Sequence, residues 1–204
     1  MIDYFALLKQ QRRPWLDPSG LKEVFLALSG GLHPDRVHGA GPTEKARAQE
    51  VYAELNAAYQ CLREPKDRLR HLLELERGAK PDQVQSIPSA LMDVSLEVGR
   101  ACREADQFLA EKAKVTSPLL QVGLFERGQD QIEKLTALVK QLESRRELLL
   151  GELQQVDSIW MQGPVTDPAG RKAQLMRLEE IYRLLSYSER WTGHLRERIV
   201  QLSL

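Results

Sequence analysis

The chain has 204 residues, and its 29 lysines and arginines balance 29 aspartates and glutamates. A formal net charge of zero argues against a nucleic-acid-binding protein that relies on bulk electrostatic attraction. Four histidines and two distant cysteines, Cys61 and Cys102, form neither a readable disulfide framework nor a zinc cage. We therefore expect buried, reduced thiols and no metal or other cofactor.

No apolar run approaches the roughly 20 residues that a membrane-spanning helix needs. The amino terminus, Met1-Ile2-Asp3-Tyr4, lacks a basic, apolar or Arg/Ser-rich targeting segment. These features predict a cytoplasmic protein that binds neither membranes nor nucleic acid. Because no nucleophile lies at a readable spacing from a base, we do not expect an enzyme.

Helix starts punctuate the whole sequence. Long alternating apolar and polar runs are absent, so no strands are expected and the fold class is all-α. Four pairs place a capping residue before a proline at the first helical position, namely Asp17-Pro18, Gly41-Pro42, Ser117-Pro118 and Asp167-Pro168.

The first 75 residues or so predict a helical hairpin with a short leading helix from Tyr4 to Leu8. Apolar residues fall on one helical face from Leu21 to Leu32, and again between Glu44 and Glu64. Between these two segments lies the tripeptide His33-Pro34-Asp35, whose proline forces His33 out of helical geometry. The first segment must therefore stop there.

This tripeptide, which we call the tip, has two interpretations. An imidazole and a carboxylate on a rigid, exposed turn can reach an arginine or a backbone group of a partner through charge-assisted hydrogen bonds. Alternatively, Asp35 merely caps an ordinary turn. Ser29-Gly30-Gly31 precedes the tip, and because each glycine costs about 1 kcal/mol relative to alanine in a helix, we expect the last turn to fray or to end early.

The second half of the chain predicts an antiparallel three-helix bundle. Residues 78–88 are polar, contain two prolines and are interpreted as a linker. Gly123 and Gly128 weaken the expectation of helix between Leu119 and Asp130. The middle helix carries an apolar heptad with Arg146 in one discordant position, comprising Ile132, Leu135, Val139, Leu142, Leu149, Leu153, Val156 and Trp160.

Several motifs around the tip resemble those of J-domain co-chaperones. They are Asp3-Tyr4-Phe5-x-Leu7-Leu8, Leu55-Asn56-x-Ala58-Tyr59-x-x-Leu62 and Pro65-x-x-Arg68. General J domains then usually turn to a Tyr-Asp pair and a Gly-rich region, whereas this chain continues into Leu72-Leu73-Glu74-Leu75, a linker and a bundle. That continuation is similar to the iron–sulphur cluster assembly co-chaperones of the HscB and Jac type.

The resemblance implies a J domain at 1–77, a linker at 78–88 and a client-binding three-helix bundle at 89–204. It implies that the J domain stimulates the ATPase of a DnaK/HscA-type chaperone, and that the bundle holds an iron–sulphur cluster scaffold protein. The implied chaperone-binding residues are Lys22, His33, Pro34, Asp35 and Arg36, the last replacing the usual lysine.

The implied client-binding residues are Leu91 and Met92, at the family's Leu-Met pair, with Leu96 beside them and Leu184 on the last helix. Tyr187 and Trp191 join Leu184 in a stripe offset by about 60–100° from the core seam of that helix. Either this stripe is a client patch, or the buried face is broad because each helix of a three-helix bundle touches two others.

The neutral second helix and its two glycines motivate a second hypothesis. Val24 to Leu32 contains no lysine or arginine, so electrostatic steering toward an acidic chaperone surface should be weaker. The alternative is a degenerate J-like module in a structural or interaction protein that does not stimulate a chaperone. In the bundle, only Asp93 and Glu97 remain of the acidic residues that usually follow the Leu-Met pair, so we expect either altered recognition of the scaffold or a different client protein.

Overall fold

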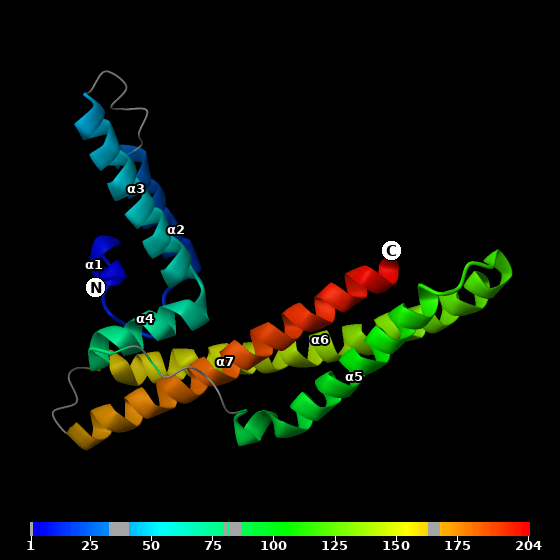
Figure 1. Ribbon diagram of the computed structural model, residues 1–204. Coiled ribbons are helices and arrows are strands. Elements are labelled where there is room, and N and C mark those ends of the chain that lie inside the picture. The colour runs from blue at the N-terminus through cyan, green and yellow to red at the C-terminus, as the bar shows by residue number, and fades with distance from the viewer. Residues whose placement is uncertain (1, 33–40, 80, 82–86, 163–167) are drawn as a thin grey trace. The chain divides into compact units, whose positions relative to one another are not determined.

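The computed structural model describes residues 2–32, 41–79, 81, 87–162 and 168–204, and every regular element in these ranges is helical (Figure 1). The all-α prediction is therefore confirmed. The elements are α1 (Tyr4–Leu7), α2 (Pro18–Leu32), α3 (Pro42–Arg63), α4 (Pro65–Arg77), the 3₁₀ turn η2 (Ser89–Leu91), α5 (Met92–Lys112), α6 (Pro118–Trp160) and α7 (Pro168–Ser203).

Capping chemistry sets the helix starts as predicted. The four helices α2, α3, α6 and α7 each begin at the proline of a predicted capping pair. At α1, the Asp3 carboxylate accepts hydrogen bonds from the backbone N–H groups of Phe5 (2.9 Å) and Ala6 (3.2 Å). At the end of α4, Gly78 has a φ of 73°, the left-handed conformation that favours glycine at a helix end.

Glycine interrupts neither α2 nor α6, so the expected early end of α2 was wrong. Helix α2 does not end early but continues through Gly30 and Gly31 to Leu32. Near this end of α2, Ser29 is buried, and its hydroxyl donates to the carbonyl of Leu26 in the same helix at 3.2 Å. Helix α6 likewise runs unbroken through Gly128, where a Cβ would lie 3.4 Å from the ring of Phe108. That distance is ordinary van der Waals contact, so the packing of α6 on α5 at this point has room for a Cβ.

The chain packs as two compact units that cut across α6 and α7. Unit 1 comprises Met1–Asp82 and Leu150–Tyr182, and unit 2 comprises Gln83–Leu149 and Arg183–Leu204. The end of α6 and the start of α7 therefore belong with the amino-terminal helices. These units do not coincide with the segments 1–77 and 89–204, whose assignment as domains stays a prediction.

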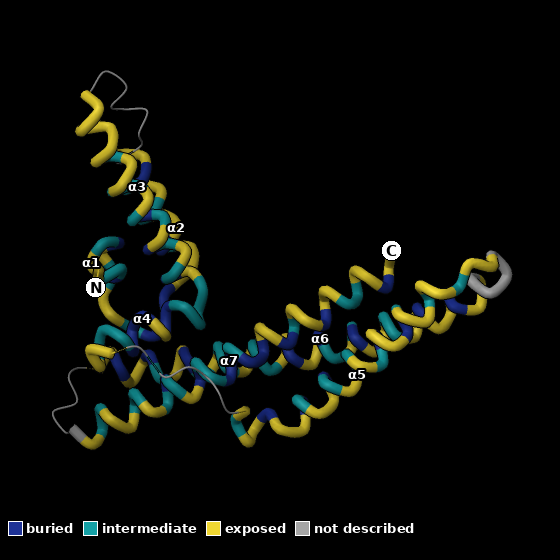
Figure 2. Tube along the Cα trace, in the orientation of Figure 1, coloured by how far each residue is buried: buried dark blue, intermediate teal, exposed yellow. Residues whose placement is uncertain are grey.

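Unit 1 has its core between the α2–α3 hairpin, α1 and α4 (Figure 2). The rings of Phe25 and Tyr59 stack across the hairpin at 4.2 Å between centroids, which fixes the two helices side by side. The fully buried side chains on these four elements include Phe5, Leu55, Leu62, Leu69, Leu72 and Leu73.

Unit 2 has a continuous core shared by α5, α6 and α7. The predicted heptad positions Leu135, Val139 and Leu142 of α6 are buried there. Three ion pairs join neighbouring helices at the surface, Arg127–Glu111 and Arg198–Asp106 to α5 and Arg196–Glu143 between α7 and α6. Such exposed pairs each contribute little, so apolar burial is the main stabilising term of this unit.

Candidate functional site

The tip lies in the chain between the end of α2 at Leu32 and the start of α3 at Pro42. Four of the predicted chaperone-binding residues lie outside the described residues: His33, Pro34, Asp35 and Arg36. Lys22, the fifth of them, is exposed on α2. What the structure does show is how unit 1 fixes the two helices that flank the tip.

Histidine 71 on α4 holds the leading helix. The backbone N–H of Tyr4 donates to Nε2 of His71 at 3.1 Å, and the imidazole stacks on the Tyr4 ring at 4.6 Å. Burial lowers the pKa of His71, which keeps the ring neutral and able to accept this hydrogen bond. His71 is thus a packed residue, only 6% exposed.

Arg68 of the Pro-x-x-Arg68 motif is a buried cation at the base of the hairpin. Only 3% of the residue is exposed, and its guanidinium donates to the carbonyls of Pro14 (2.8 Å) and Leu62 (2.7 Å). Burial lowers the pKa of Arg68 to about 10, so the side chain remains charged at neutral pH. One side chain therefore ties the loop before α2 to the carboxyl end of α3.

Asp157 near the end of α6 binds the same loop. Its carboxylate pairs with Arg13 and also accepts a hydrogen bond from the backbone N–H of Trp15 at 3.1 Å. One helical turn further on, the indole N–H of Trp160 donates to the carbonyl of Arg12 at 2.9 Å. The loop preceding α2 is thus held by α4 through Arg68 and by α6 through Asp157 and Trp160.

Asp157 was not among the functional residues predicted from the sequence. A signal was present, because Asp157 lies four residues after Leu153 and three before Trp160, which places a carboxylate on the buried face of α6. A carboxylate in such a position needs a cationic partner. The partner, Arg13, comes from a segment without helical periodicity and was not identifiable by spacing.

The predicted client-binding residues separate into two groups. Met92 and Leu96, one turn apart on α5, are 48% and 67% exposed. The others, Leu91, Leu184, Tyr187 and Trp191, are all buried in the core of unit 2.

The structure shows the broad buried face that was one of the two interpretations of the α7 stripe. The other interpretation, a client patch formed by Leu184, Tyr187 and Trp191, was wrong because these side chains are buried. The physical reason is that α7 packs against both α5 and α6, and one seam cannot cover two neighbours. We therefore define the client surface by the two exposed side chains, Met92 and Leu96. Its role in binding stays a prediction.

Several other chemistries have no support among the described residues. No group of three or more His, Cys, Asp or Glu side chains there could hold a metal ion. No described helix is long and apolar enough to cross a membrane. Burial raises the pKa of the Cys61 thiol to about 11 and also raises that of Cys102, so both stay protonated at neutral pH rather than acting as thiolates.

Two helices separated in the chain by His33-Pro34-Asp35 and followed by further long helices are the arrangement expected of J-type co-chaperones. The chain is 30% identical over 179 residues to the "Co-chaperone protein HscB homolog" of Cupriavidus taiwanensis, covering 88% of this chain and 89% of the relative. This chain therefore belongs to the HscB co-chaperone family of iron–sulphur cluster assembly.

Other comparisons agree with this membership. An HscB homologue of Azoarcus is 32% identical over 112 residues, which span 63% of that relative. The solved structures of HscB from Vibrio cholerae (TM-score 0.64, 20% identity, 98% of this chain and 99% of that one) and of human HscB (0.59, 18%, 98% and 81%) share the fold. No family model matches the chain.

Proposed function

We propose that this protein stimulates the ATPase of a DnaK/HscA-type chaperone and delivers an iron–sulphur cluster scaffold protein to it in the cytoplasm, supporting cluster transfer and protein maturation. The observation that supports the proposal is the set of contacts at the base of the α2–α3 hairpin. Phe25, Tyr59 and Arg68 fix α2 and α3 on either side of the tip in a chain of the HscB family.

The mechanism is positioning of two partners rather than chemistry by this chain. A rigid hairpin reduces the conformational entropy lost when the tip docks. Asp35 and His33 then engage the chaperone through charge-assisted hydrogen bonds and promote hydrolysis of the ATP that the chaperone holds. The client surface at Met92 and Leu96 holds the scaffold, so that both partners are bound by one chain. No cofactor of its own takes part.

Asp35→Asn tests the chaperone half of the proposal. The amide keeps the shape of the side chain but removes the charge, so we expect stimulation of single-turnover ATP hydrolysis to fall to the basal rate of the chaperone. We expect the circular dichroism of the variant to match that of the wild type, because an amide in place of a carboxylate keeps the size of the side chain. The matched control is Asp130→Asn, an exposed aspartate of α6, which should stimulate like the wild type.

If Asp35→Asn still stimulates the ATPase of the chaperone, the role proposed for Asp35 in the tip is wrong. If the correctly folded wild type fails to stimulate, the second candidate, a degenerate J-like module, replaces the proposal. One observation favours that candidate. Among the described exposed side chains of α2 there is one cation, Lys22, and its charge is balanced by one anion, Glu23.

The double variant Met92→Ser with Leu96→Ser tests the client half. Both side chains are exposed, so the fold should be unaffected. Burying a large apolar side chain contributes about 1.5–3 kcal/mol, so we expect scaffold affinity to fall by about tenfold or more in calorimetry. Leu148→Ser, which alters a 75% exposed leucine of α6 in the same unit, is the control. Equal affinity of wild type and double variant would discard this surface.

A further inference from the structure

Helix α1 is joined to α4 by a hydrogen bond that requires one particular form of a histidine. The backbone N–H of Tyr4 donates to Nε2 of His71 at 3.1 Å, so Nε2 must be unprotonated and the proton of the neutral ring must lie on Nδ1. A second proton on the ring would place two donors opposite each other. This hydrogen bond can therefore form only while His71 is neutral.

The packing around His71 restricts its ring to this orientation and keeps it away from water. The imidazole stacks on the ring of Tyr4 at 4.6 Å and on that of Phe5 at 5.9 Å between centroids. Because the residue is also buried, an imidazolium at this position has little access to water, which would otherwise solvate its charge. Burial and the hydrogen bond thus favour the same neutral form of the ring.

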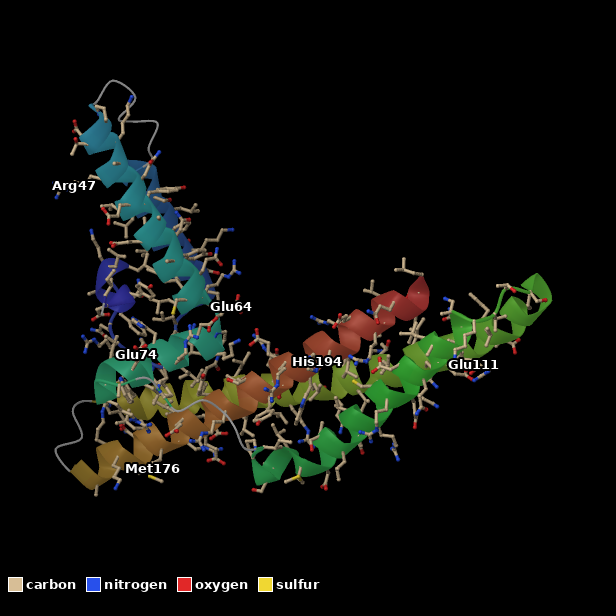
Figure 3. All side chains as sticks on the ribbon, in the orientation of Figure 1. Arg47, Glu64, Glu74, Glu111, Met176 and His194 are labelled. Carbon is tan, nitrogen blue, oxygen red and sulfur yellow. The ribbon has the colours of Figure 1, made fainter. Side chains whose placement is uncertain are left out.

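Charged side chains of both signs lie near His71. Asp3, before α1, and Glu74, on α4 (Figure 3), favour the protonated ring. Arg12 and Arg70 disfavour it. The Asp3 carboxylate already caps α1 and pairs with Arg12 at 2.8 Å, so it can reach an imidazolium only by giving up these contacts. Burial outweighs the nearby charges and lowers the pKa of His71 below its ordinary value of 6.5.

Helix α1 is also held by apolar contacts, which limit what one proton can do. Phe5 and Leu8 are fully buried, and α1 packs on α3 as well as on α4. The burial of these two side chains stabilises the docked position of α1 even without the hydrogen bond to His71. We therefore expect protonation to weaken the docking of α1 rather than to unfold unit 1.

We propose that the contact between His71 and Tyr4 is a pH-sensitive switch: protonation of Nε2 breaks the hydrogen bond and increases the fraction of molecules in which α1 is detached from α4. The pKa of His71 is lower in the docked state, so docking is strongest above pH 6.5 and weakens as the pH falls toward the lowered pKa. Within that window the equilibrium constant for detachment rises by up to about tenfold per pH unit. The switch is independent of the proposed function.

The test is hydrogen exchange of the Tyr4 amide in the full chain, corrected for the exchange rate of an unfolded chain at each pH. Between about pH 7.5 and about pH 5, we expect the protection of this amide in the wild type to fall by about threefold or more. In His71→Gln the side-chain oxygen can accept the hydrogen bond but does not titrate, so the protection should not depend on pH. His194→Gln, at an exposed histidine of α7 (Figure 3), is the control and should keep the pH dependence of the wild type.

Nitrogen NMR of the His71 ring gives a second measurement that needs no variant. At about pH 7.5 it should show the proton on Nδ1 and none on Nε2, and the titration midpoint should lie below 6.5. A proton on Nε2 at that pH would overturn the inference. So would an equal loss of Tyr4 protection in the wild type and in His71→Gln, because another group would then cause it.

Discussion

Replacing Asp157 by alanine should lower the free energy of unfolding by about 3 kcal/mol. The Asp157 side chain is 5% exposed, and its carboxylate is the partner of the Arg13 guanidinium and of the Trp15 N–H. Removing it leaves both donors without an acceptor in a region that water reaches poorly. Urea denaturation followed by circular dichroism measures the change.

The control for this prediction is Asp130→Ala on the same helix. Asp130 is exposed, and the substitution brings the same gain in helix propensity, so the difference between the two variants isolates the contacts of Asp157. We expect Asp130→Ala to change stability by less than about 0.5 kcal/mol. A loss below about 1 kcal/mol for Asp157→Ala would mean that Arg13 and Trp15 find other partners, and that α6 does not fix the loop before α2.

The second large effect is expected at Arg68. Methionine preserves the apolar stem of the side chain but donates no hydrogen bond, so the carbonyls of Pro14 and Leu62 lose their donor. Each buried, unsatisfied carbonyl costs about 1–3 kcal/mol, and relief from burying a cation offsets part of this. We expect Arg68→Met to lower the free energy of unfolding by about 3 kcal/mol.

Arg70→Met is the matched variant for Arg68, because Arg70 lies on the same helix, its side chain is 53% exposed, and it forms a surface ion pair with Asp67 at 3.4 Å. Its loss should stay below about 0.5 kcal/mol. Comparable losses at the two positions would show that position 68 acts through helix propensity or bulk charge rather than through the two carbonyls.

The architecture could be predicted from the sequence because its signals are local. Proline after a capping residue marks a helix start whatever surrounds it, and the heptad of α6 fixes a buried face through helical geometry alone. The same local reasoning failed at Gly30 and Gly31. Helix propensity favours an early end to α2, but α2 packs on α3 and remains helical to Leu32.

Residues of the candidate site could be predicted from the sequence only where they belong to a motif or where helical spacing places them on an exposed position. Exposure of Met92 follows from its place one residue beyond the core position Leu91. Burial of Tyr187 and Trp191 does not follow from their own helix, because it depends on how many neighbours α7 has. The Arg13–Asp157 pair joins residues that are 144 positions apart, a separation that no periodicity encodes.

Helix α6 has 43 residues and runs without interruption from one unit into the other. This continuity restricts how the length of the gene can change. Inserting one codon near Leu150 would turn everything beyond it by about 100° and shift it by about 1.5 Å. Leu153, Asp157 and Trp160 would then leave the face they share with Leu142. Insertions or deletions of about seven, eleven or eighteen residues come close to preserving the phase. Substitutions on the exposed side of α6 should therefore accumulate freely in evolution, while its length should stay fixed.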